Sequence, residues 1–281
     1  MIFEFLPNET LIECFKYLNA FDLFYSFDGL NSRLNNLIRN VRLYINFEDV
    51  NKTIFDKFCA KMLIDSNIRN QIYSIEILND DQCFQCNLFF SSFPPNKFPN
   101  LQRFISIYPL LGDEEDYFAY NYDIYEYRPR PKNDDEQIHL KIKQSDLPLS
   151  QLRTLSILNL VSLRSNIHQT SIISLTILKF YLKDSECLFN NLPMLNYLHI
   201  KSIDRCREKN LNILSNYQYS CHLKQLIIGQ FNEKFENFEM FVKQTPNLKS
   251  LTFISHDNHD IYIIDANRWE YLIVSSIPKL Y

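Results

Sequence analysis

Cysteine and histidine occur in two short pairs whose spacing could suit a metal ion. Two residues separate Cys83 from Cys86, and two separate His256 from His259. A structural zinc site takes four thiolate or imidazole ligands, and no second pair stands at the usual spacing from either of these pairs. We therefore predict structural thiols at 83 and 86, a polar loop around the two histidines, and no metal site.

The other reactive residue types form no recognisable catalytic motif. The 3 glycines, at positions 29, 112 and 229, lie too far apart for a glycine-rich loop that cradles phosphate. Serine, histidine and acidic residues share no local motif, although a Cys–His pair formed in space stays open. We predict a protein that is not an enzyme and that uses no cofactor.

Composition favours a folded protein with a large core. Of the 281 residues, 46% are hydrophobic and 15% aromatic, and the formal net charge is −4. Such a chain can bury a core but offers no broad basic surface, so we expect no nucleic acid among its partners.

The sequence also bears on location. No run of about 18 uncharged apolar residues occurs, and Glu4, Pro7 and Glu9 interrupt the place where a signal peptide would stand. The 7 cysteines are irregularly spaced, which is typical of free thiols in a reducing compartment. We expect a soluble protein of the cytoplasm, the nucleus or both, with no membrane partner.

Residues 6–41 show the spacing of three short amphipathic helices. Their apolar faces consist of Leu11, Ile12, Phe15 and Leu18, then Leu23, Phe24, Phe27 and Leu30, then Leu34, Leu37, Ile38 and Val41. Pro7 suits an opening turn, Glu9 favours the positive end of the first helix dipole, and Asp22 is the expected cap of the second helix. Helices this short are marginal alone, so their apolar faces must pack together or cover the domain that follows.

A three-point apolar spacing, Leu-x-x-Leu-x-Ile, recurs behind these helices. Its copies begin at Ile72, Leu101, Leu152, Leu175, Leu195, Leu223, Leu248 and Trp269. Successive starts lie 20 to 29 residues apart, except for one step of 51, and helical patterns lie between them. A strand followed by a helix cannot bury its apolar face alone, so the spacing predicts stacked copies. An ordinary α/β domain whose buried strands happen to look alike is the alternative.

The step of 51 residues contains an acidic, tyrosine-rich stretch at 112–136. Long loops in compact domains are usually functional or disordered, so we expect either a partner-binding insertion or a solvated one.

Candidate binding residues follow from strand alternation, which turns the third and fifth positions of each copy away from the core. This alternation places Ile177 at a third position, facing outward. From the two rows we select five candidate binding residues: Arg103, Lys179, Tyr197, His199 and Tyr271. Tyrosine and arginine often anchor protein interfaces. An ordinary solvated face is the simpler interpretation of the same residues.

The helical part resembles an F-box. The match runs from Leu6-Pro7-x-Glu9-x-Leu11-Ile12-x-x-Phe15-x-x-Leu18, through Asp22-Leu23, to Leu30-Asn31-x-Arg33-Leu34-x-x-Leu37-Ile38. It departs from many F-boxes at Leu34 and Asn35, where they carry tryptophan. The remaining chain resembles the leucine-rich repeats that commonly follow an F-box, without the usual Asn or Cys at the ninth position.

The resemblance implies a fold of class α/β. Residues 1–45 would form a three-helix F-box, and residues 46–281 an irregular leucine-rich-repeat solenoid with parallel strands on its concave face and helices on its convex face. An F-box binds the Skp adaptor and through it a cullin. By resemblance, the residues at or behind that interface are Leu6, Pro7, Glu9, Leu11, Ile12, Phe15 and Leu23.

The function implied is that of a substrate-recognition subunit of a Skp–cullin–F-box E3 ubiquitin ligase, with an unknown protein client on the repeats. The alternative is a leucine-rich-repeat scaffold that binds a protein partner without any ligase.

Overall fold

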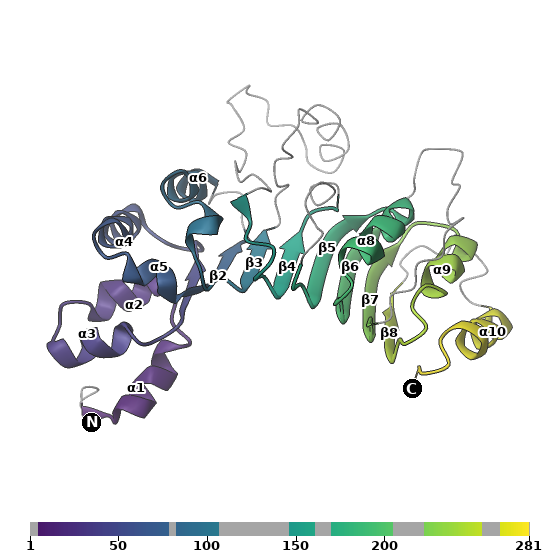
Figure 1. The fold of residues 1–281 in the computed structure, drawn as a ribbon, viewed down its shortest axis with the longest axis horizontal. Coiled ribbons are helices and arrows are strands. Elements are labelled where there is room, and N and C mark those ends of the chain that lie inside the picture. The colour runs from purple at the N-terminus through teal and green to yellow at the C-terminus, as the bar shows by residue number, and fades with distance from the viewer. Residues whose placement is uncertain are drawn as a thin grey trace, which may run out of the picture. The chain divides into compact units, whose positions relative to one another are not determined.

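Three short helices open the chain at the positions that the apolar spacing predicts. They are α1 (Asn8–Phe15), α2 (Ala20–Phe27) and α3 (Ser32–Ile38). Side chains of Asn19 and Asn31 accept hydrogen bonds from the first turns of α2 and α3. The cap of α2 is therefore Asn19 and not Asp22, which lies inside the first turn. The computed structural model describes residues 5–78, 83–106, 146–160, 170–204, 222–254 and 265–280 (Figure 1).

These residues belong to two compact units, residues 1–148 and 149–281. In the first unit, α4 (Lys52–Ile64) and α5 (Asn67–Gln71) connect β1 (Leu43–Asn46) to β2 (Ile72–Ile77), and α6 (Cys83–Ser92) and a 3-10 turn at Pro95–Lys97 precede β3 (Arg103–Ser106). The three strands pair in parallel in the order β1-β2-β3. The sequence analysis did not predict β1. The three-point apolar spacing would start there at Asn40, which is polar.

Phenylalanine rings join the helical front to the strand-bearing part of the first unit. The Phe21 ring of α2 lies 4.8 Å from that of Phe58 in α4 and 5.5 Å from that of Phe47 after β1. Asn19 donates to the carbonyl of Asn46 at 2.6 Å, and Lys61 forms an ion pair with Asp28 at 2.8 Å. The expected domain boundary at residue 45 falls inside this packed unit.

The second unit consists of parallel strands with helices against one face. Strands β4 (Thr154–Ile157), β5 (Ser174–Phe180), β6 (Tyr197–Ile203), β7 (Gln225–Phe231) and β8 (Ser250–Phe253) pair in sequence order. A 3-10 turn at Leu182–Asp184 and α8 (Ser185–Asn191) connect β5 to β6, and α9 (Phe235–Val242) connects β7 to β8 (Figure 1). Strand–helix units that pair in sequence order give the solenoid-like α/β arrangement that the recurring spacing predicts.

Strand register corrects the expected placement of one copy. Leu175 pairs with Leu155 and Leu198, so it is the second point of its copy, and Ile172 is the first. Ile177 is consequently buried in the core instead of facing outward. Lys179 pairs with Ser202, outside the fifth-position row, where Thr176 stands instead. The segment contains two overlapping three-point spacings, and the structure uses the one that starts at Ile172.

The expected last copy is not a strand. Residues Ala266–Ser276 form helix α10. Its N-cap is Asp265, whose side chain accepts hydrogen bonds from the backbone N–H groups of Asn267 and Arg268. Leu272 is buried on this helix, and the Trp269 ring lies 5.1 Å from that of Phe235 and 5.6 Å from that of Phe253. Trp269 and Leu272 are three residues apart, a spacing that also places them on one helical face.

Three neighbouring copies in the second unit carry an apolar residue at their ninth position. Phe180, Ile203 and Phe231 are aligned on β5, β6 and β7, and all three are buried. The Phe231 ring lies 5.6 Å from Phe238 of α9. The contact between Phe231 and Phe238 therefore joins this apolar row to α9.

Gly229 marks a close approach of two backbones in this sheet. A Cβ atom at this position on β7 would lie 2.7 Å from the carbonyl oxygen of Lys201 on β6. That distance is shorter than an ordinary van der Waals contact, so the strand requires glycine here.

Candidate functional site

The turn that leads into α1 is held in place by an arginine of α3. Pro7 precedes the helix, and its carbonyl accepts a hydrogen bond from the Leu11 N–H at 3.1 Å. Arg33 donates from Nε to Oδ1 of Asn8 at 2.8 Å and from its terminal NH2 to the carbonyl of Leu6 at 2.5 Å. These bonds connect residues more than twenty positions apart, so the turn has a defined orientation on the helical front.

The seven residues expected at or behind the adaptor interface divide by burial. Leu11, Phe15 and Leu23 are fully buried in the first unit. The Phe15 ring packs 5.0 Å from that of Phe27. These three side chains can shape a binding surface only indirectly, since they position the helices that carry it.

The other four expected adaptor residues are accessible. Pro7 and Glu9 are exposed, and Leu6 and Ile12 are half-buried. Phe5, next to this group, is 79% exposed and was missed by the sequence analysis because it precedes the helical pattern. We call Phe5, Leu6, Pro7, Glu9 and Ile12 the N-terminal edge.

A second candidate surface lies on the strands of the second unit. Its third-position row contains Thr154, Ser174, Tyr197, Gln225 and Ser250, and its fifth-position row contains Ser156, Thr176, His199, Ile227 and Thr252. Core residues such as Leu198 and Ile200 alternate with these residues along each strand and are buried on the opposite side. We call the two rows together the sheet face.

Two of the five expected client-binding residues stand side by side on the sheet face. Tyr197 and His199 are half-buried on β6, two residues apart. Partial burial lowers the pKa of His199, and the charge of Lys201 lowers it further. Both effects favour a neutral imidazole at neutral pH, which can donate one hydrogen bond and accept another.

The remaining three expected client-binding residues lie elsewhere. Lys179 is half-buried on β5 but outside the two rows. Arg103 belongs to the first unit, where its guanidinium lies 3.1 Å from a carboxylate oxygen of Glu76 on the neighbouring strand. Tyr271 is 69% exposed on helix α10 instead of on a strand.

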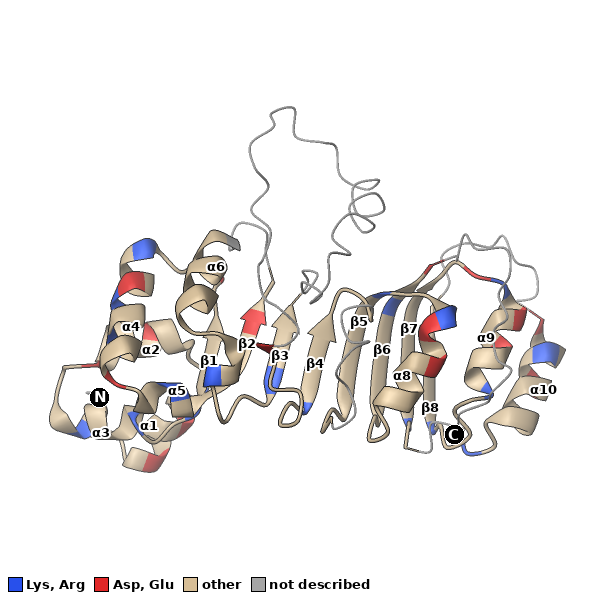
Figure 2. Cartoon of the chain, turned by 45° about the horizontal axis from the view of Figure 1, so that its top comes forward, with Lys and Arg blue, Asp and Glu red and all other residues tan. Residues whose placement is uncertain are grey.

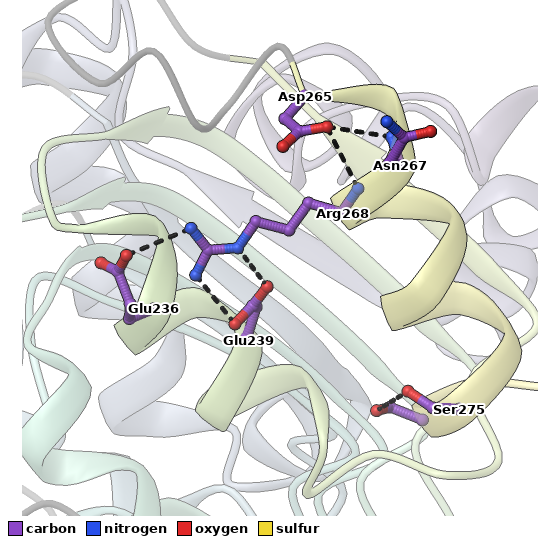
Figure 3. A network of polar contacts seen from close by, with 7 residues as sticks. Glu236, Glu239, Asp265, Asn267, Arg268 and Ser275 are labelled. Carbon is purple, nitrogen blue, oxygen red and sulfur yellow. Dashed lines mark hydrogen bonds and ion pairs between the residues drawn. The ribbon is translucent and has the colours of Figure 1, made fainter.

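A charged network attaches α10 to α9 (Figure 3). Arg268 donates to both carboxylate oxygens of Glu239, at 2.7 and 3.1 Å, and to Glu236 at 3.1 Å. The two bonds to Glu239, and then the one to Glu236, raise the pKa of Arg268 above its ordinary value. A permanently charged guanidinium between two carboxylates holds the helices together and has no evident catalytic use.

Within the described ranges, no three His, Cys, Asp or Glu residues gather as metal ligands. The side chain of Cys83, both residues of the His256–His259 pair and the insertion at 112–136 lie outside those ranges. Burial, and secondarily the charge of Asp56, raises the pKa of the Cys59 thiol to about 12. A thiol with that pKa stays protonated at neutral pH and is a poor nucleophile.

Among the described helices, none is both long and apolar enough to cross a membrane. No family model matches the chain, and no curated protein matches it either. The resemblance to an F-box and to leucine-rich repeats therefore rests on the residues quoted in the sequence analysis.

Proposed function

We propose that this protein is a non-enzymatic substrate-recognition subunit of a Skp–cullin–F-box ubiquitin ligase. The N-terminal edge would bind the Skp adaptor, and the sheet face would bind a protein client. The mechanism is positional, because a client held next to the ligase meets the activated ubiquitin as a neighbour instead of by free diffusion.

The observation that carries the proposal is the state of the opening turn. Leu6, Pro7 and Glu9 follow the spacing of the F-box motif, and these residues remain accessible on a turn that Arg33 fixes to α3. An accessible apolar turn with a fixed backbone loses little conformational entropy on binding, which favours docking to a preformed partner surface.

The second support for the proposal is the array of parallel strands that follows the three opening helices in the sequence. Parallel strands that pair in sequence order present neighbouring rows of side chains, and repeat proteins generally bind their partners along such surfaces. We propose that the strand–helix units are irregular leucine-rich repeats, with apolar residues at the ninth position of three of them.

The test is binding of the purified chain to the Skp adaptor by isothermal titration calorimetry. Replacing Leu6 and Pro7 together by alanine should weaken binding at least about tenfold, because both lie on the accessible edge. The matched control is Leu63→Ala with Ile64→Ala, two residues 69% and 85% exposed at the end of α4, which should leave binding unchanged.

Two outcomes would contradict the proposal: a folded wild-type chain without adaptor binding, or equal binding by both double variants. The first outcome would favour the alternative, a repeat scaffold that binds its partner without a ligase.

A further inference from the structure

The residues just before the strands of the second unit form a line across the N-terminal ends of these strands. Backbone N–H groups at the start of one strand donate hydrogen bonds to a carbonyl at the start of the preceding strand, as in Ser174 N–H to Arg153 at 3.1 Å and Ser250 N–H to Lys224 at 3.0 Å. The residues in this line, which we call the start edge, are Arg153, Ile173, Asn196, Lys224 and Lys249. All five are exposed.

The start edge contains the cations Arg153, Lys224 and Lys249, and neither it nor the sheet face contains a carboxylate. Lys201 lies two residues beyond His199 on β6, next to the two rows. None of these four forms an ion pair with a described residue, whereas Arg268 on α10 has two glutamates. Figure 2 shows blue segments of this unit at the strand starts and red segments on α8 and α9; blue segments also lie beside α8 and on α10.

Two of these lysines concentrate positive charge at one place on the start edge. Lys224 and Lys249 occupy equivalent positions on neighbouring strands, which lie about 4.8 Å apart in a sheet. Like charges at such positions repel and destabilise the pair. An anionic ligand would relieve that repulsion, so the same arrangement favours binding of negative charge.

We propose that the start edge and the sheet face bind an acidic peptide segment, rich in Asp and Glu. That this segment belongs to a client protein rests on the proposed function. That it is acidic rests only on the charges of the surface. Carboxylates of the peptide would face Arg153, Lys224 and Lys249. Its backbone would meet the hydroxyl and amide groups of Ser174 and Gln225.

The distribution of the cations favours carboxylates over phosphate groups. Recognition of phosphate usually uses a cluster of arginines with forked guanidinium groups, whereas this surface carries one arginine and lysines on separate strands. Single-stranded nucleic acid would need a series of aromatic platforms for its bases, and Tyr197 is the one aromatic residue in the two described rows.

Fluorescence anisotropy of the full chain with a short fluorescein-labelled Asp/Glu-rich peptide tests the proposal. The same peptide with Asn and Gln in place of the acids should not bind, and raising the ionic strength from about 0.05 to 0.3 M should weaken binding of the acidic peptide. Lys224→Gln with Lys249→Gln should weaken it about tenfold, the effect of two partly exposed charge contacts.

The matched control is Lys183→Gln with Lys234→Gln, which removes the same charge from exposed positions at the opposite ends of the strands of the same unit. This variant should bind the peptide like the wild type, and thermal melts should show all the variants folded. Equal weakening by both double variants would overturn the proposal, since it would indicate a response to net charge alone. Equally tight binding of polyuridylate would overturn it as well.

The two proposals can fail independently. If the acidic peptide does not bind but the Skp adaptor does, the peptide site is refuted and the ligase role stands. If the peptide binds and the adaptor does not, the peptide site stands on a scaffold without a ligase.

Discussion

Replacing Gly229 by valine tests whether the strands β6 and β7 approach each other as closely as the structure has them. Valine is among the best strand formers, and β-propensity alone favours it over glycine by up to about 1 kcal/mol. The structure predicts the opposite sign, because even a Cβ atom at this position would lie 2.7 Å from the Lys201 carbonyl oxygen.

The magnitude follows from two opposing effects. Forcing extra methyl groups into a packed site usually costs about 1–3 kcal/mol. After subtraction of the gain in β-propensity, we expect the free energy of unfolding of the second unit to fall by up to about 2 kcal/mol. With an m-value near 2 kcal/mol/M in urea, the midpoint should fall by up to about 1 M.

The assay is urea unfolding followed by circular dichroism, with Gln230→Val as the matched control. Gln230 is the next residue on the same strand and is exposed, so valine there should change stability by less than about 0.5 kcal/mol. Gly229→Val at or above wild-type stability, with the control unchanged, would refute the close approach and the strand register built on it.

Three further predictions concern the core, the thiols and pH. Phe238→Ala should destabilise the second unit by about 3–5 kcal/mol in the same urea assay, because this fully buried ring contacts rings from β7, β8 and α10. N-ethylmaleimide at pH 7 should label exposed Cys14 well before Cys59, whose pKa is about 12, and mass spectrometry of the peptides should give the order. The folded state lowers the pKa of His199 below 6.5, so the unfolded chain binds more protons between those two pKa values and stability falls as pH drops through them. His199→Gln should flatten this part of the stability profile, and an unchanged profile would contradict it.

The sequence predicted the elements wherever one pattern dominated. The three opening helices follow apolar spacings that fit no strand, and the copies at Leu195 and Leu223 lead into β6 and β7 as expected. Each of these segments has one way to bury its apolar residues, so local pattern and tertiary packing agree.

The errors occur where a spacing has two solutions. Between Ile172 and Phe180 two three-point spacings overlap, and the pairing with β4 and β6 selects one of them. Around Trp269 and Leu272 the same residues suit a strand or a helix, and the cap at Asp265 with the neighbouring phenylalanines stabilises the helix. These choices depend on contacts with distant segments.

The candidate sites were less predictable than the fold. The hydrogen bonds of Arg33 join residues 25 and 27 positions apart, and no local pattern indicates them. The start edge was missed because its cations belong to different copies and become neighbours only when the strands pair.

The position of Trp269 makes its intrinsic fluorescence a probe of helix α10. It is the single tryptophan of the chain, and its ring lies within 5.6 Å of those of Phe235, Phe238 and Phe253. Its emission spectrum therefore reports whether α10 is docked, without any attached dye. Detachment of this helix would shift the emission to longer wavelength as the indole enters water, so fraying at this end of the second unit can be followed in real time apart from unfolding of the first unit.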